Sequence, residues 1–92
     1  MAYIGSNAYS FGQSISLDLP SVDANSVAEE TFTVAGLRAD GGPVVVEKRT
    51  TNTGLILHAA RVSAANTLAL TLENVTGSAI NAAAQDFYIV QL

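Results

Sequence analysis

Short segments in which apolar and polar residues alternate are the feature that most limits how this 92-residue chain can fold. The clearest are residues 14–19 and 67–72, where isoleucine or leucine occupies every second position. A period of two places the apolar side chains on one face of a β-strand. Because turn-forming residues recur about every ten positions, the pattern predicts an all-β fold, a small antiparallel β-sandwich of jelly-roll or immunoglobulin-like type.

Three further segments have the composition of strands. Residues 29–35 and 87–92 combine aromatic and aliphatic residues, and residues 44–46 are three consecutive valines. Such residues fit the pleated surface of a sheet. The unbroken valine run indicates a strand that is buried on both faces. The preceding residues 40–43 read Asp-Gly-Gly-Pro, which predicts a turn whose glycines are available for a positive φ.

The segment 55–62 is open to two interpretations. Its alanines and the spacing of its apolar residues favour a helix. We prefer a strand, because a short polar link joins this segment to the alternating residues 67–72, which is the pattern of a β-hairpin. As a strand, the segment would place four side chains on one face: Ile56, His58, Ala60 and Val62.

The length fits one domain, which we divide into an extended N-terminal arm, residues 1–12, and a single β-sandwich domain, residues 13–92. Residues 1–17 carry no charged side chain but hold half of the aromatic residues. A frayed terminus gains nothing from aromatic rings, whereas an arm that docks on a neighbouring subunit buries a large apolar area through each ring. The candidate interface residues of the arm are Tyr3, Ile4, Tyr9 and Phe11.

Charge and cysteine content narrow the possible partners. The net charge is −4, and only 13% of the residues are charged, about half of the usual share. Nucleic-acid binding needs clustered lysine and arginine, so we expect no nucleic-acid partner. The apolar runs are too short to span a membrane, and the lack of cysteine excludes a disulfide or a thiolate zinc site. With so few charges, much of the surface has to be apolar or neutral, which is typical of surfaces that assemble.

The sequence offers no convincing catalytic group. His58, the only histidine, lies between Leu57 and Ala59, and we interpret it as a core or interface residue rather than a base. Glu29 and Glu30 would point to opposite faces of a strand, so they do not form an acid–base pair. We therefore predict a protein that is not an enzyme and has no catalytic, cofactor-binding or metal-binding residues. We also expect the thin fold to leave little room for a ligand cavity of about 300 Å³.

One long segment, residues 60–81, resembles a segment that is common in tailed-bacteriophage virion proteins; it reads ARVSAANTLALTLENVTGSAIN. The Thr-Phe-Thr-Val strand that begins at Thr31, the valine-rich strand and the terminal aromatic strand follow the same order as in that family. The resemblance thus spans residues 31–92, about two thirds of the chain. The chain departs from the family at residues 82–84, where three alanines replace a proline-bearing loop, and the arm lies outside the match.

The resemblance implies a small β-sandwich that trimerises on a phage particle. As a whole chain it is most similar to a capsid decoration (cement) protein, which binds the outer surface of the major capsid shell as an oligomer and stabilises it. The implied partners are the major capsid protein and further copies of the chain in a homotrimer, located at the capsid surface of the virion. Linked contacts across the shell would act as a clamp, because linkage raises their effective concentration. Two other interpretations stay open: a tail or fibre component that contacts the host, and a small cellular binding module.

If the arm docks on the capsid or on a neighbouring decoration subunit, deletion of residues 1–12 will lower the occupancy of the protein on phage heads. It will also lower the temperature at which filled heads rupture, because the aromatic contacts of the arm are lost. Gel quantification of purified heads measures the first quantity, and heating with a DNA-binding dye measures the second. Unchanged occupancy and heat resistance would contradict a docking role for the arm.

Overall fold

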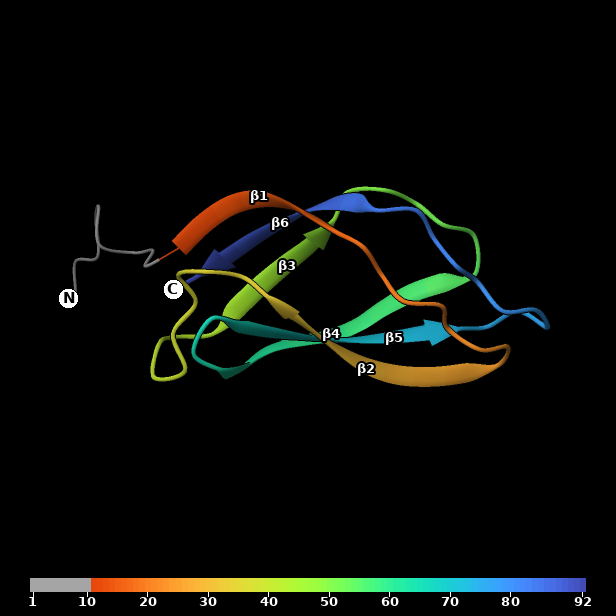
Figure 1. Ribbon diagram of the computed structural model, residues 1–92, viewed down its shortest axis with the longest axis horizontal. Helices are drawn as coiled ribbons and strands as arrows, with labels where there is room; N and C mark the ends of the chain where they lie inside the picture. Colours follow the sequence, from red (N-terminus) through yellow and green to blue (C-terminus); the bar gives the residue numbers. More distant parts are fainter. Residues whose placement is uncertain (1–10) are drawn as a thin grey trace.

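A computed structural model describes residues 11–92, which contain six β-strands and no helix. The strands form two antiparallel three-stranded sheets, β1-β6-β3 and β2-β5-β4, which confirms the all-β prediction. Figure 1 shows the sheets as two layers, with the C-terminus beside the start of β1. The strands are β1 (Phe11–Leu17), β2 (Ser26–Thr33), β3 (Val44–Lys48), β4 (Leu55–Ala64), β5 (Thr67–Asn74) and β6 (Gln85–Gln91).

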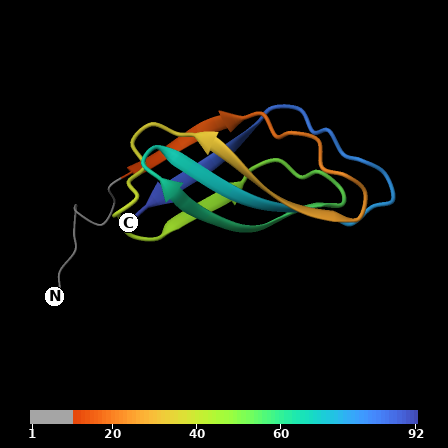
Figure 2. The ribbon, with the colours of Figure 1, turned by 60° about the horizontal axis from the view of Figure 1, so that its bottom comes forward.

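The connections between strands tie the two layers together. Only β4 and β5 are consecutive and paired, as the hairpin pattern predicts. Each of the other connections in the described part of the chain leads from one sheet to the other, and Figure 2 shows these loops crossing at both ends of the sandwich. β5 and β6 are the central strands of their sheets, and the other four described strands are edge strands.

The hydrophobic core lies between the two central strands. Inward side chains of β5 (Leu68, Leu70 and Leu72) and of β6 (Phe87 and Ile89) are completely buried. Their spacing follows the alternation of a strand with one face against the core. Residues outside the strands complete the core, among them Leu19, Val22, Val34 and Leu37.

The strand interpretation of residues 55–62 is confirmed, but the face assigned to it is wrong. A β-bulge between Leu57 and Ala59 shifts the register of β4 against β5. A bulge adds one unpaired residue, so the alternation of inward and outward side chains changes phase there. Ile56 and His58 are consequently exposed. The side chains of β4 that pack in or against the core are Leu55, Leu57, Ala60 and Val62.

The burial of residues 44–46 and the backbone conformation of the glycines in residues 40–43 also differ from expectation. β3 is an edge strand with only one face against the core, and Val45 is 59% exposed rather than buried. Gly41 and Gly42 are not among the residues with positive φ. A Cβ atom at Gly41 would collide with the Gln91 side chain, and one at Gly42 would collide with Leu92. Glycine is therefore needed at this turn for the close approach of the chain end rather than for backbone freedom.

β1 begins earlier than the predicted start of the domain. Phe11 and Gly12 pair with Gln91 and Val90 of β6, so they belong to the sheet rather than to the arm. The sequence pattern does not predict this extension of β1, because Gly12 has no side chain that could contribute to an alternation of apolar and polar residues. The rest of the predicted arm, residues 1–10, lies outside the described part of the chain. A deletion that tests the arm without removing strand residues therefore ends at position 10.

A buried asparagine joins the loops at one end of the sandwich. Asn74 is 0% exposed at the end of β5. Its Nδ2 donates to the backbone carbonyls of Val22 and Ser78, at 3.0 and 2.8 Å. Its Oδ1 accepts from the backbone N–H and the hydroxyl of Thr76, at 2.8 and 2.7 Å. All hydrogen-bonding groups of this side chain thus serve to position loops, as a buried amide requires.

Truncation of a central core side chain should destabilise the protein strongly. We expect Leu70→Ala to lower the free energy of unfolding by about 2–5 kcal/mol, because it removes buried methyl groups and leaves a cavity. Urea unfolding followed by circular dichroism measures this change. The matched control is Val27→Ala on β2, where the side chain is 60% exposed and the expected change is within about 0.5 kcal/mol. Equal effects of the two substitutions would contradict the assigned core.

Candidate functional site

The interface residues predicted for the arm fall into two groups. Tyr3, Ile4 and Tyr9 lie outside the described residues, so their docking role stays a prediction. Phe11 starts β1, and its half-buried ring packs against the core and over Gly36. Phe11, one of the four residues predicted to dock on another subunit, therefore packs within its own chain.

The outer face of the β2-β5-β4 sheet carries a bidentate ion pair. Arg61 on β4 donates to both carboxylate oxygens of Glu29 on β2, with two N–O distances of 2.9 Å. The strand register places Ala69 and Thr71 of β5 between the partners, and these small side chains leave room for the bridge. The hydrogen bond from Arg61 lowers the pKa of Glu29 below its usual value of 4.5, aided by the positive charge.

A second polar contact on this face involves the only histidine. The bulge in β4 lies at His58, whose Nε2 contacts Oε1 of Glu73 on β5. The histidine side chain is 48% exposed, so its predicted place in the core is wrong, and a place in an interface stays a prediction. Sequence spacing did not predict a carboxylate partner for His58, because the contact depends on the register of β4 against β5.

The open side of the sandwich, which we call the β3–β4 seam, is formed by residues 44–46 of β3 and 57–60 of β4. These two edge strands flank a shallow groove of about 250 Å³. The walls of the groove are mostly valine, leucine and alanine, with His58 as the polar exception. A second groove, of about 310 Å³, continues past Val44 and Ala60 toward the turn at Gly41. The seam is therefore a largely apolar surface beside two sheet edges.

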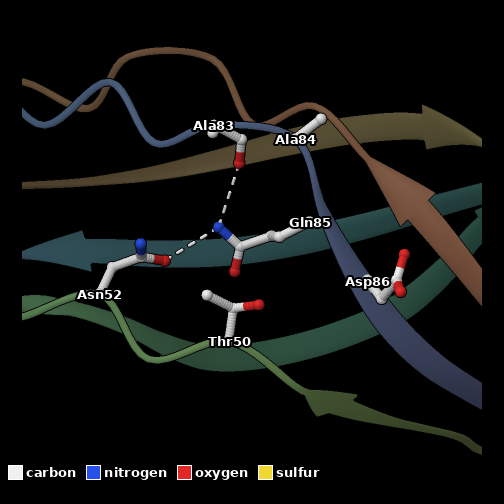
Figure 3. Close-up of a pocket in the computed structure, with 6 residues that line it drawn as sticks. All are labelled: Thr50, Asn52, Ala83, Ala84, Gln85 and Asp86. Carbon is white, nitrogen blue, oxygen red and sulfur yellow. Dashed lines mark hydrogen bonds between the residues drawn. The ribbon is translucent and has the colours of Figure 1, made fainter.

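A polar pocket of about 300 Å³ lies at the start of β6, and we call it the Gln85 pocket (Figure 3). Gln85 is only 7% exposed. Its Nε2 donates to Oδ1 of Asn52 at 2.9 Å and to the carbonyl of Ala83 at 3.3 Å. Its Oε1 is buried without a hydrogen-bond partner among the described residues. The lining residues are Thr50, Asn52, Ala83, Ala84, Gln85 and Asp86.

Lys48 completes the polar network behind this pocket. Its Nζ donates to Oδ1 of Asn52 at 2.6 Å and to the carbonyl of Thr50 at 2.5 Å. Burial lowers the pKa of Lys48 from its usual 10.5. The sequence predicts that so thin a fold leaves little room for a ligand cavity of about 300 Å³. The Gln85 pocket nevertheless has this volume, because the loops before β4 and β6 form it at the surface, outside the core.

Within residues 11–92, no three His, Cys, Asp or Glu side chains lie together in a way that would hold a metal ion. No helix in this part of the chain is long and apolar enough to cross a membrane. Comparison of the chain with protein-family models, curated proteins and solved structures finds no match.

The Glu29–Arg61 pair gives a testable pH dependence. Because the pKa of Glu29 is lowered in the folded protein, its stabilising contribution is present above about pH 4.5 and is lost as the pH falls through the folded value. Carboxyl ¹³C NMR should show Glu29 titrating below 4.5 in the wild type and closer to 4.5 in Arg61→Gln. Arg38→Gln is the matched control, since Arg38 pairs with Asp40 instead. An unchanged Glu29 titration in Arg61→Gln would contradict the pair.

Proposed function

We propose that this chain is a structural protein of the bacteriophage virion, a capsid decoration (cement) protein that binds the outer surface of the major capsid shell as a homo-oligomer and stabilises it. The observation that carries the proposal is the β3–β4 seam, where two sheet edges and an apolar groove lie on the same side of the sandwich. The phage assignment itself rests on the sequence resemblance.

The edges of the seam are suited to association between subunits. β3 pairs only with β6, and β4 only with β5, among the described strands. The outer edge of such a strand presents backbone N–H and C=O groups that a neighbouring chain can satisfy. The bulge in β4 limits how long any added strand can be, because it breaks the regular spacing of these groups. Such a contact gives a closed oligomer when the rotation that relates the subunits closes, as in the proposed trimer.

The exposed apolar side chains support the same conclusion. Val45 at the seam is 59% exposed, and the low charge of the chain leaves few groups to solvate such surfaces. Apolar surface at the centre of a contact is what makes association favourable. A trimer held in this way would present several capsid-binding surfaces at once, so weak individual contacts would add to a firm clamp.

The decisive experiment is the addition of purified protein to phage heads that lack it. We expect saturable binding at a fixed ratio to the major capsid protein, together with a higher rupture temperature of filled heads. Sedimentation with the heads measures the first quantity, and dye access to the DNA measures the second. Absence of binding would contradict the decoration role and favour the tail or fibre interpretation, which adsorption to host cells then tests.

Two matched variants connect this experiment to the seam. Val45→Lys places an ammonium group in the seam, where a subunit contact would bury it without a partner, so the affinity between subunits should fall at least about tenfold. Val27→Lys is the control, because Val27 is 60% exposed on β2, away from the seam. Light scattering after size exclusion should show a smaller oligomer for Val45→Lys only. Identical oligomers for the two variants would exclude the seam as the subunit contact.

A further inference from the structure

The free edge of β3 presents regularly spaced hydrogen-bonding groups to the β3–β4 seam. Just after this strand, the backbone N–H of Arg49 donates to the Asp86 carbonyl at 3.3 Å. In an antiparallel ladder the bonded residues recur at every second position, so Val45 bonds to β6 in the same way. The N–H and C=O groups of Val44 and Val46 therefore point toward the seam. β3 keeps one register along its length, whereas the register of β4 is shifted by its bulge.

One further strand would complete this edge. It would extend the β1-β6-β3 sheet, and its side chains would point alternately into the groove of about 250 Å³ and to the outer face of the sheet. The groove is shallow, and none of the described residues that line it is Asp, Glu, Lys or Arg. On the outer face, Val45 is 59% exposed. The added strand therefore needs small or aliphatic residues at every second position and apolar residues between them.

The sequence of residues 1–10 matches this requirement. The segment carries no charged side chain. Four residues at alternate positions are small or aliphatic: Ala2, Ile4, Ser6 and Ala8. The other set of alternate positions includes Tyr3 and Tyr9. As a strand, the segment would place the first set in the groove and a tyrosine ring beside Val45, and an aromatic residue opposite a β-branched one is a stabilising cross-strand pair.

The place where this segment joins the fold favours a second copy over its own sandwich. Phe11 and Val44 lie on the two sides of Gln91, so β1 starts two strand spacings from β3 and about 14 Å from a strand added beyond it. Crossing this width takes about four residues, and the reversal of direction takes about two more. Too few of residues 1–10 would then be left to pair with β3. A neighbouring copy can use all of them, over a reach of up to about 33 Å.

We infer that residues 2–9 of a second copy of this chain add as a strand to the free edge of β3, with Ile4 in the groove of the β3–β4 seam. The inference rests on the proposed function, because it names the occupant of the proposed subunit contact. Each copy gives one arm and receives one, so the contact is heterologous and forms a closed ring if the rotation between copies closes, as in the proposed trimer.

The test is photo-cross-linking of the full chain with benzoylphenylalanine in place of Tyr3. Equal amounts of ¹⁴N and ¹⁵N protein are unfolded together, refolded, irradiated and digested with trypsin. The digestion separates residues 39–48, which contain β3, from residues 50–61, which contain most of β4. We expect mass spectrometry to find links from position 3 to these two peptides. Half of the links should join a heavy chain to a light one, as random mixing of subunits requires.

Benzoylphenylalanine in place of Tyr88 is the matched control. Tyr88 is 40% exposed and lies opposite Glu47 in the same sheet. Links from position 88 to residues 39–48 should therefore stay within one chain and one isotope. The control shows what contact inside a single chain looks like in this experiment.

Hydrogen exchange of the full chain measures the pairing itself. The amides of Val44 and Val46 should exchange at least about tenfold more slowly than those of Glu29 and Thr31. The latter two point to the free edge of β2, because the alternate residues of that strand bond to β5. The comparison thus sets the β3 edge against a second edge of the same protein.

A pair of arm variants makes both measurements specific. Ile4→Asp would bring a carboxylate into the uncharged groove, so it should remove the links between heavy and light chains and the slow exchange. Asn7→Asp adds the same charge on the other set of alternate positions and should leave both unchanged. Neither substitution touches a described strand, so the fold itself stays intact.

The outcomes separate the arm exchange from the decoration role. Links within one isotope only would indicate that the arm occupies its own seam. Links that reach neither β3 nor β4, fast exchange at the β3 edge, or equal effects of the two arm variants would also overturn the inference. Binding of the same proteins to phage heads is measured separately. Heads that bind protein without these links overturn the arm exchange alone, and links without head binding overturn the decoration role alone.

Discussion

The leucines of β5 and the inward residues of β6 exclude water from the middle of the sandwich, and the other strands are arranged around this contact. Leu68, Leu70 and Leu72 meet a core that Phe87 and Ile89 complete from the opposite sheet. Each central strand then holds two edge strands by backbone hydrogen bonds. Packing between the sheets supplies the apolar stabilisation, and hydrogen bonding within each sheet places the edges, including the two that form the seam.

Period-two patterning was sufficient to predict the class of fold and most of the strands. Residues 67–72 and the hairpin with β4 were correct because alternation and a short polar link are local properties. The errors arose where tertiary context overrides local pattern. The bulge beside His58 reverses the phase of β4, and Val45 is exposed because β3 became an edge. Gly42 is fixed by the approach of Leu92, a residue fifty positions away in the sequence.

The surface features were less accessible to prediction than the fold. The Gln85 pocket depends on Asn52 and Lys48, which come from a loop and a strand end far from residue 85 in the sequence. One signal was present: Gln85 and Gln91 continue the inward alternation of Phe87 and Ile89, and a polar residue on such a face needs a partner. Alternation indicates that Gln85 is buried, but only the loop geometry reveals that its oxygen lacks a partner.

The position of β6 has a consequence for how the chain is made. Among the described strands β6 is synthesised last, yet β1 and β3 have no other hydrogen-bonded partner among these strands. The β2-β5-β4 sheet can pair first, but its leucines stay exposed while Phe87 and Ile89 are missing. Translation that stops before residue 85 would therefore release a chain with exposed apolar side chains, which is prone to aggregate. It would not release a folded protein of lower stability. Burial of the core therefore requires that synthesis has passed residue 91, the end of β6.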